Sequence, residues 1–497
     1  MNATASRAPI ADTAPGPIAA APRAAREARP DDRWMAIGYN VLLALCLPIA
    51  LAYLLWHVFC SGRIRQGFRE RLGLLPEGLR KKLEGDDAVI WVQAVSSGEV
   101  TAALPVIREL RLREPLAKIV LSTTTPTGRE MAEKHARGEV DAVFYFPLDF
   151  PFVVNRVLAI VRPALLVLVE TELWPNLLSA AQRRGTRVVA VNAKISDRAL
   201  RRSRIVRPVY RWMMRNVDQL CAQSGEDAER LKELGADPAI VGVLGNTKFD
   251  GEYVEVSAAQ AARMRQELGV PTAGPVVVAG STNPREEEVV LDSFAKIRMR
   301  HADARLIIAP RHPERAEEIE SLVRDRGWHA ARRTRMLAGD PDADPSSQAE
   351  DTVVILDTMG ELAALYAVGT VVFVGGSLIP KGGHNILQPL AQGKPVLFGP
   401  HMHNQRDTAA LALAEKVAWQ VENADEMADE MLRLIESPTE LARVDRKARD
   451  IIAQNRGAAR RCAAVLGDAL SPQTQNEPGT AEASGTTHAT ADTALNA

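Results

Sequence analysis

Short apolar runs alternate with longer amphipathic segments along most of the chain from Ala88 onward. The first half of the chain contains such runs at residues 89–92, 118–121, 142–145, 165–169 and 187–191. These runs are apolar along most of their length and rich in β-branched residues, which is typical of parallel strands buried on both faces of a sheet. The helix-length segments between them therefore predict a doubly wound α/β domain.

The same pattern restarts in the second half of the chain. Apolar runs recur at residues 275–279, 305–308, 352–355, 370–374 and 395–398. Residues 251–274, between the two halves, have the pattern of a helix and a connection marked by Gly and Pro. Because a chain of 497 residues exceeds the usual size of one core, we predict two Rossmann-like domains facing a cleft. The predicted boundaries are 60–250 for the first domain and 275–470 for the second, which includes C-terminal helices.

The N-terminal region predicts a membrane anchor. Residues 34–59 are mostly apolar, and as a helix they would span about 39 Å, enough to cross a bilayer. Basic residues follow this segment, whereas the arginines before it are interspersed with acidic residues, which favours a cytoplasmic C-terminal body. A cleaved signal peptide is the alternative, but the apolar run is too long and no small-residue cleavage site follows it. Residues 1–33 and 471–497 are predicted to be disordered.

Composition narrows the class of protein. Hydrophobic residues make up 46% of the chain and charged residues 25%, which is ordinary for a globular protein. The formal net charge of −1 argues against a nucleic-acid partner. The four cysteines are scattered without a C-x-x-C pair, so neither a disulfide framework nor a zinc site is predicted, and a reducing compartment is favoured.

A glycine-rich loop follows the run at residues 370–374. It contains the pairs Gly375-Gly376 and Gly382-Gly383, and the segment after it has helix-like spacing. Glycines let backbone N–H groups approach an anion, and a helix N-terminus adds a partial positive charge. Neither the Walker pattern nor G-x-G-x-x-G is present. We therefore predict that this loop binds a single phosphate.

Other strand ends of the second half also carry candidate ligand groups. Ligands of open α/β sheets bind at the carboxyl ends of the strands. Gly280-Ser281-Thr282, Pro310-Arg311-His312-Pro313 and Met359-Gly360-Glu361 all follow predicted strands. With the glycine loop they predict a nucleotide site. His401 and His403 have the spacing of a metal pair, but no third ligand is evident nearby, so we interpret them as incidental loop residues.

Acidic residues gather at the strand ends of the first half. Glu99 follows Ser96-Ser97-Gly98 and opens a predicted helix, so it is either a first-turn charge or a general base facing the cleft. Glu170 and Glu172 follow another predicted strand. Capping of the next helix explains one acidic residue, but two suggest a further role. Lys248 is either a surface charge or a cation that stabilises a departing phosphate.

A basic segment lies between these motifs. Arg204, Arg207, Arg211 and Arg215 recur at helical spacing. They form either a solvated helix face or a surface that meets anionic headgroups or a phosphorylated lipid substrate.

Several of these motifs together resemble the 3-deoxy-D-manno-octulosonic acid (Kdo) transferases of lipopolysaccharide synthesis. The matching segments run in the family's order from about residue 34 to about residue 466, and the segment 63–73 resembles the stretch that follows the family's anchor. They are residues 95–99, 170–176, 245–250, 309–314 and 382–385. The resemblance implies an inverting GT-B glycosyltransferase at the cytoplasmic face of the inner membrane. Its first domain would bind the acceptor, lipid IVA, and its second the donor, CMP-Kdo.

The resemblance also implies roles for single residues. Glu99 matches the proton acceptor, and Glu170 and Lys248 match positions that stabilise the transition state. The matches to CMP-binding positions are Pro310, Arg311, Met359, Gly360, Glu361, Asn385, Ile386, Leu387 and Gln388. Most of the family has Glu where this chain has Gln388, and an amide accepts at one end only, whereas a carboxylate accepts at both.

The donor chemistry predicts that no metal or other cofactor is needed. CMP-Kdo carries one phosphodiester charge, which a helix N-terminus and a Lys or Arg can balance. The carboxylate of Kdo needs a further cation, for which Arg311, Lys381 and Lys248 are candidates. Two rival interpretations remain: another membrane-anchored GT-B transferase with a different nucleotide sugar, and a non-catalytic nucleotide-binding scaffold at the membrane.

Overall fold

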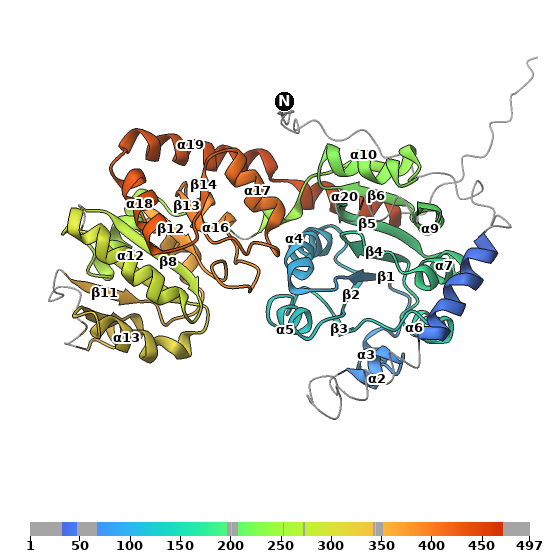
Figure 1. The fold of residues 1–497 in the computed structure, drawn as a ribbon. Helices are drawn as coiled ribbons and strands as arrows, with labels where there is room; N and C mark the ends of the chain where they lie inside the picture. The colour runs from blue at the N-terminus through green and yellow to red at the C-terminus, as the bar shows by residue number, and fades with distance from the viewer. Residues whose placement is uncertain are drawn as a thin grey trace, which may run out of the picture.

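The chain folds into two α/β lobes, each built on a parallel seven-stranded sheet (Figure 1). The computed structural model describes residues 32–46, 67–195, 200, 207–251, 253–271, 274–340, 343 and 351–470. The prediction of two doubly wound sheets is confirmed. Disorder was predicted for residues 1–33 and 471–497; of these only Asp32 and Arg33 are described, and both are helical. Arg204 of the predicted basic segment also lies outside the described residues.

The first sheet has the strand order β3-β2-β1-β4-β5-β6-β7. Its strands are β1 (Val89–Gln93), β2 (Lys118–Thr123), β3 (Ala142–Tyr145), β4 (Leu165–Val169), β5 (Arg187–Ala193), β6 (Gln219–Ala222) and β7 (Val241–Val243). All neighbouring strands pair in parallel. The sequence pattern predicted the first five strands but missed β6 and β7, which are short; β6 begins with Gln219 and β7 contains Gly242.

The second sheet has the strand order β10-β11-β9-β8-β12-β13-β14. Its strands are β8 (Val276–Thr282), β9 (Arg305–Pro310), β10 (His329–Arg332), β11 (Thr352–Ile355), β12 (Val371–Val374), β13 (Val396–Phe398) and β14 (Ala418–Gln420). The two edge strands, β10 and β14, were not predicted. Because edge strands are partly exposed, they lack the continuous apolar pattern of the buried ones.

Helices cover both faces of each sheet. Helices and sheet together form two hydrophobic clusters in each lobe, one on either face of the sheet. The longer helices of the first lobe are α4 (Ser97–Arg113), α5 (Pro126–His135), α6 (Pro151–Val161), α7 (Pro175–Arg183), α9 (Arg207–Met214) and α10 (Gly225–Glu233). The longer helices between the last strand of the first sheet and residue 455 are α11 (Ala258–Glu267), α12 (Glu286–Arg300), α13 (Ala316–Arg324), α17 (Arg406–Ala414), α18 (Ala424–Ile435) and α19 (Pro438–Asn455). Short helices include α2 (Phe68–Arg71), α3 (Glu77–Lys82), α14 (Arg333–Leu337), α15 (Leu362–Leu365) and α16 (Leu387–Ala391).

The chain crosses between the lobes twice. The first crossing follows the 3-10 helix η4 (Thr247–Asp250), and the second leads from α19 to α20 (Ala458–Leu470). Although α20 ends the described chain, its Cys462 and Leu466 are buried in the core of the first lobe, against α4. Asp250 accepts hydrogen bonds from the backbone N–H groups of Gly457 and Ala459, so the two crossings are bonded to each other.

A helix at residues 32–46 lies against the first lobe. On its inner side, Tyr39 donates a hydrogen bond to Asp149, and Asn40 exchanges hydrogen bonds with Asn176 at the start of α7. On its outer side Trp34, Val41, Leu42 and Leu45 are exposed. Within the described part of the chain, no helix combines the length and the apolarity needed to span a bilayer. Residues 47–59 of the predicted anchor lie outside that part.

Candidate active site

Glu99 occupies the first turn of α4, just after the carboxyl end of β1. The N–H of Val95 donates to Glu99 Oε2 at 2.6 Å, and Ser96 Oγ donates to Oε1 at 3.1 Å. These bonds draw the carboxyl group back over the turn that connects strand and helix, and the residue is only 8% exposed. The local sequence Ser-Ser-Gly-Glu thus fixes a buried carboxyl group at the sheet edge where ligands bind in this fold class.

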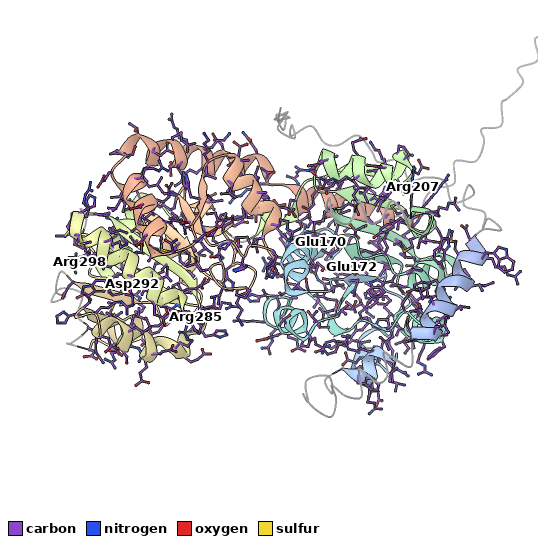
Figure 2. The ribbon with its side chains drawn as sticks, viewed as in Figure 1. Glu170, Glu172, Arg207, Arg285, Asp292 and Arg298 are labelled. Carbon is purple, nitrogen blue, oxygen red and sulfur yellow. The ribbon has the colours of Figure 1, made fainter. Side chains whose placement is uncertain are left out.

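The electrostatic surroundings of Glu99 favour its neutral form. Its pKa is raised to about 8, chiefly by burial and also by the charges of Glu170 and Glu172, although the hydrogen bonds from Val95 and Ser96 oppose the shift. Burial and Glu170 also raise the pKa of Glu172. Figure 2 shows Glu170 and Glu172 in the first lobe, beside α4. A helix N-terminus favours the charged form of a carboxyl group, but desolvation outweighs that effect at Glu99.

Glu170 is held in a strained backbone conformation. It directly follows β4 and has a φ of 62°, a left-handed value that costs energy in a residue with a side chain. Lys194 Nζ lies 3.1 Å and Lys248 Nζ 3.3 Å from Glu170 Oε1. The structure therefore brings together the predicted pair Glu170 and Lys248, and it adds Lys194 as a second cation.

Lys194 is a site residue that sequence reasoning missed. It follows β5, and its Nζ also lies 3.3 Å from Asp407 Oδ2 in the first turn of α17. Burial lowers the pKa of Lys194, but the charges of Glu170 and Asp407 outweigh burial, so the net pKa is raised. This lysine therefore links Glu170 of the first lobe to Asp407 of the second lobe.

Lys248 is positioned by its own neighbours on η4. The side chain of Asn246 accepts the N–H of Lys248 at 3.0 Å, which begins the 3-10 turn. Asn192, another left-handed residue with a φ of 56°, accepts the N–H of Thr247 through its side chain. Because Asn192 lies on β5 just before Lys194, one strand end positions both cations around Glu170.

The predicted nucleotide motifs of the second lobe meet at the carboxyl ends of β8, β9 and β12. The N–H of Arg311 donates to the carbonyl of Thr282 at 2.9 Å. The side chains of Asn283 and His384 lie 3.4 Å apart, between Asn283 Nδ2 and His384 Nε2. The pKa of His384 is lowered to about 4, chiefly by burial and also by the charges of Arg311 and His312. His384 is therefore neutral near pH 7, beside the cation Arg311.

The remaining CMP-binding candidates differ in what they can offer a ligand. Ile386 and Leu387 are buried in the core of the second lobe, so only their backbone atoms are available for binding. Asn385 accepts the N–H of Leu387, the first residue of α16, through its side-chain oxygen. Glu361 forms an ion pair with Arg333. Pro310 ends β9, Met359 is 59% exposed, Gly360 has a left-handed φ of 94°, and Gln388 is partly buried.

The glycine loop uses much of its own hydrogen-bonding capacity. The N–H groups of Gly375 and Gly383 donate to the carbonyls of Gly280 and Gly376. The N–H of Gly376 donates to the carboxylate of Glu286 at 2.7 Å. A phosphate site in this loop therefore needs donors other than these three amides. Among the described residues, no group of three or more His, Cys, Asp or Glu is arranged to hold a metal ion.

Two Rossmann-like lobes, one with a buried carboxyl group at its sheet edge and the other with converging nucleotide motifs, define a two-domain glycosyltransferase of the GT-B class. The family model described as "3-Deoxy-D-manno-octulosonic-acid transferase (kdotransferase)" matches residues 66–251.

Individual relatives agree with this match. The 3-deoxy-D-manno-octulosonic acid transferase of Haemophilus influenzae is 31% identical over 435 residues, covering 86% of this chain and 97% of that protein. The enzyme of the same name from Bordetella pertussis is 33% identical over 391 residues, covering 77% and 88%. A solved structure, the C-terminal CMP-Kdo binding domain of WaaA from Acinetobacter baumannii, is 30% identical over 39% of this chain and 96% of that one, with a TM-score of 0.35. This chain belongs to the family of the 3-deoxy-D-manno-octulosonic acid transferases, as its motifs predicted.

Proposed function

We propose that this enzyme transfers Kdo from CMP-Kdo to lipid IVA with inversion at the anomeric carbon. Family membership supports Kdo as the transferred sugar. The observation that carries the mechanistic proposal is the buried carboxyl group of Glu99, whose pKa is raised to about 8. A group that titrates near the working pH can accept a proton from the incoming sugar hydroxyl as the new bond forms.

The cations around Glu170 have a separate role in this proposal. Departure of CMP adds negative charge to its phosphate while the sugar gains oxocarbenium character. Lys248, fixed through Asn246 and Glu170, would stabilise the departing phosphate, with Glu170 holding the amine in place. The ion pair between Lys194 and Asp407 supports this assignment, because it shows that the edge carrying Glu170 faces the second lobe.

The carboxylate of Kdo requires a further cation on the donor side. Arg311 is the best placed of the three candidates, because it follows β9 beside the neutral His384. Arg311 and Lys381 are both exposed, but Lys248 is already paired with Glu170. With these cations available, we propose that transfer proceeds without a metal ion or another cofactor.

We further propose that the enzyme is held at the cytoplasmic face of the inner membrane by a single-pass anchor at residues 34–59. The exposed apolar side chains of the helix at residues 32–46 support contact with lipid. Arg207 lies on the side of the first lobe that carries this helix (Figure 2). Arg207 and Arg211 are exposed and could meet acidic headgroups, whereas Arg215 forms an ion pair with Asp32.

Transfer from enzymatically generated CMP-Kdo to radiolabelled lipid IVA, with products resolved by mass, tests the proposal. We expect products heavier by one or more Kdo units, which also counts the additions. Absence of product from protein that still binds CMP would contradict the assignment of donor or acceptor. The same assay with other nucleotide sugars separates this proposal from its enzymatic rival.

A further inference from the structure

Glu286 is a buried carboxylate that neither the sequence motifs nor the proposed mechanism uses. It is the first residue of α12 and has no exposed surface. Figure 2 labels Arg285, the residue before it, at the end of α12 nearer the first lobe. Removing a carboxylate from water is costly unless other groups replace its hydration. The contacts of Glu286 therefore identify what it stabilises.

Backbone amides of two loops replace that hydration. Glu286 Oε2 accepts the N–H of Gly376 at 2.7 Å and that of Asn283 at 3.0 Å. Glu286 Oε1 accepts the N–H groups of Ser377 and Leu378 at 3.0 and 2.9 Å. Hydrogen bonds to a charged acceptor are roughly twice as strong as neutral ones. Three consecutive amides of the glycine loop thus converge on one carboxylate.

Three converging amides form a concavity of the kind that binds phosphate in other proteins. Here an anion of the protein itself fills it. The packing leaves little room for a second anion, because a Cβ atom on Gly375 would lie 2.6 Å from the carbonyl oxygen of Ser281 and 2.8 Å from Glu286 Oε2. The loop lies directly against the start of α12.

We infer that Glu286 is a positioning residue of the donor site, whose carboxylate acts as a permanent internal anion of the loop at residues 376–378. By fixing this part of the loop, it sets the position of the following segment, residues 382–388, against the nucleotide. A short network extends its influence to the site, because Asn283 Nδ2 lies 3.4 Å from both Glu286 Oε2 and His384 Nε2. The phosphate of the donor then binds outside the three amides that Glu286 occupies.

The geometric part of this inference can be tested without any assay of transfer. We expect the amides of residues 376–378 to be protected from hydrogen exchange in the native protein. Glu286→Gln replaces one acceptor oxygen with an NH₂ group facing N–H donors. Loss of one charged hydrogen bond corresponds to at least roughly tenfold faster exchange. Glu288→Gln removes the same charge from the same helical turn and should leave exchange unchanged. Equal exchange in native and E286Q protein would overturn the inference.

The functional part rests on the proposed donor and uses CMP as the probe. We expect E286Q to weaken CMP binding and raise the KM for CMP-Kdo by about tenfold or more, with little change in kcat or in the KM for lipid IVA. Glu286→Asp keeps the charge and should recover part of the loss. Native CMP affinity in an E286Q protein whose loop amides have become exposed would refute the positioning role.

A third measurement covers the case in which E286Q does not fold. In the native protein, CMP should add protection within residues 382–388 but not at residues 376–378. Added protection at residues 376–378 would mean that the nucleotide displaces Glu286, and the inference would fail. If CMP produces the expected pattern but no Kdo is transferred, the proposed function fails while the role of Glu286 stands.

Discussion

Lys194 Nζ lies 3.3 Å from Asp407 Oδ2, and this ion pair joins the end of β5 in the first lobe to helix α17 of the second. The same amine lies 3.1 Å from Glu170. Lys194 therefore has two acidic partners, one inside the candidate active site and one on the second lobe. The side chain of Asp407 is half exposed, so its pair with Lys194 is weak, whereas Glu170 is mostly buried.

The two partners of Lys194 lead to different mutant phenotypes. Lys194→Met removes one of the two cations beside Glu170, and we expect kcat to fall by about ten- to a hundredfold, the value of one charge-assisted hydrogen bond. Steady-state kinetics with CMP-Kdo and lipid IVA measures this fall.

Asp407→Asn is the matched control for the lysine variant. It breaks only the exposed pair between the two lobes, so kcat should change by less than about fivefold. A larger loss in D407N than in K194M would mean that the contact between the lobes matters more than the charge beside Glu170.

Glu99 should be essential to transfer but not to donor binding. Glu99→Gln keeps the size of the side chain and removes its capacity to accept a proton, and removal of a general base costs about 10²- to 10⁴-fold in rate. We expect CMP binding to stay within about twofold of the native value, because the nucleotide motifs lie on the other lobe. Turnover is measured with the mass-resolved assay and CMP affinity by calorimetry; turnover near the native rate would exclude Glu99 as the base.

The raised pKa of Glu99 predicts the direction of the pH dependence. Only the ionised carboxylate accepts a proton, so kcat/KM should rise with pH and level off above about pH 8. Lowering the substrate concentration well below KM makes the profile report the free enzyme. A profile that is flat from pH 6 to 9, with chemistry rate-limiting, would contradict the assignment.

The same group should lower the stability of the protein at alkaline pH. The folded-state pKa of Glu99 lies above its ordinary value of 4.5, so the folded protein binds this proton more tightly than the unfolded chain. Its contribution is fully present below pH 4.5 and is lost as the pH rises through about 8. E99Q keeps a neutral group at this position, and we expect its Tm to exceed that of the native protein above pH 8 but not near pH 5. Thermal melts at the two pH values measure the difference, and equal shifts at both would refute this explanation.

The sequence predicted the buried strands because their positions are apolar on both faces, as in Leu165–Val169. It failed at β10, whose residues His329–Arg332 are mostly exposed or half-buried at the sheet edge. It also selected Glu99, Glu170 and Lys248, because each follows a strand or its connecting turn. The rule that ligands bind at strand ends does not predict which residue each of these side chains contacts.

Two residues show why these partners could not be predicted. Lys194 resembles any surface lysine until its partner Asp407, 213 positions away, is brought beside it. Glu286 resembles an ordinary first-turn acid, yet the amide of Gly376 that it binds lies 90 positions further along the chain. Such contacts depend on how distant segments of the fold pack together, so the local pattern of apolar and polar residues does not predict them. The raised pKa of Glu99 also depends on packing, since it follows from burial and from the charges of Glu170 and Glu172 on another strand end.

Gly383 offers a test of whether the close packing of the glycine loop determines nucleotide affinity. Its φ is +75°, and a Cβ atom at this position would lie 2.2 Å from Met402 Sδ. We expect Gly383→Val to weaken CMP binding by at least about tenfold, because a displaced loop misplaces the segment that follows it. Gly327 has nearly the same backbone conformation, with a φ of +77°, but its Cβ would meet open space. Gly327→Val therefore imposes the same backbone strain without the collision, and it should leave CMP affinity unchanged. If the two variants lose affinity equally, backbone strain rather than packing against Met402 explains the effect; if neither does, the loop does not shape the donor site.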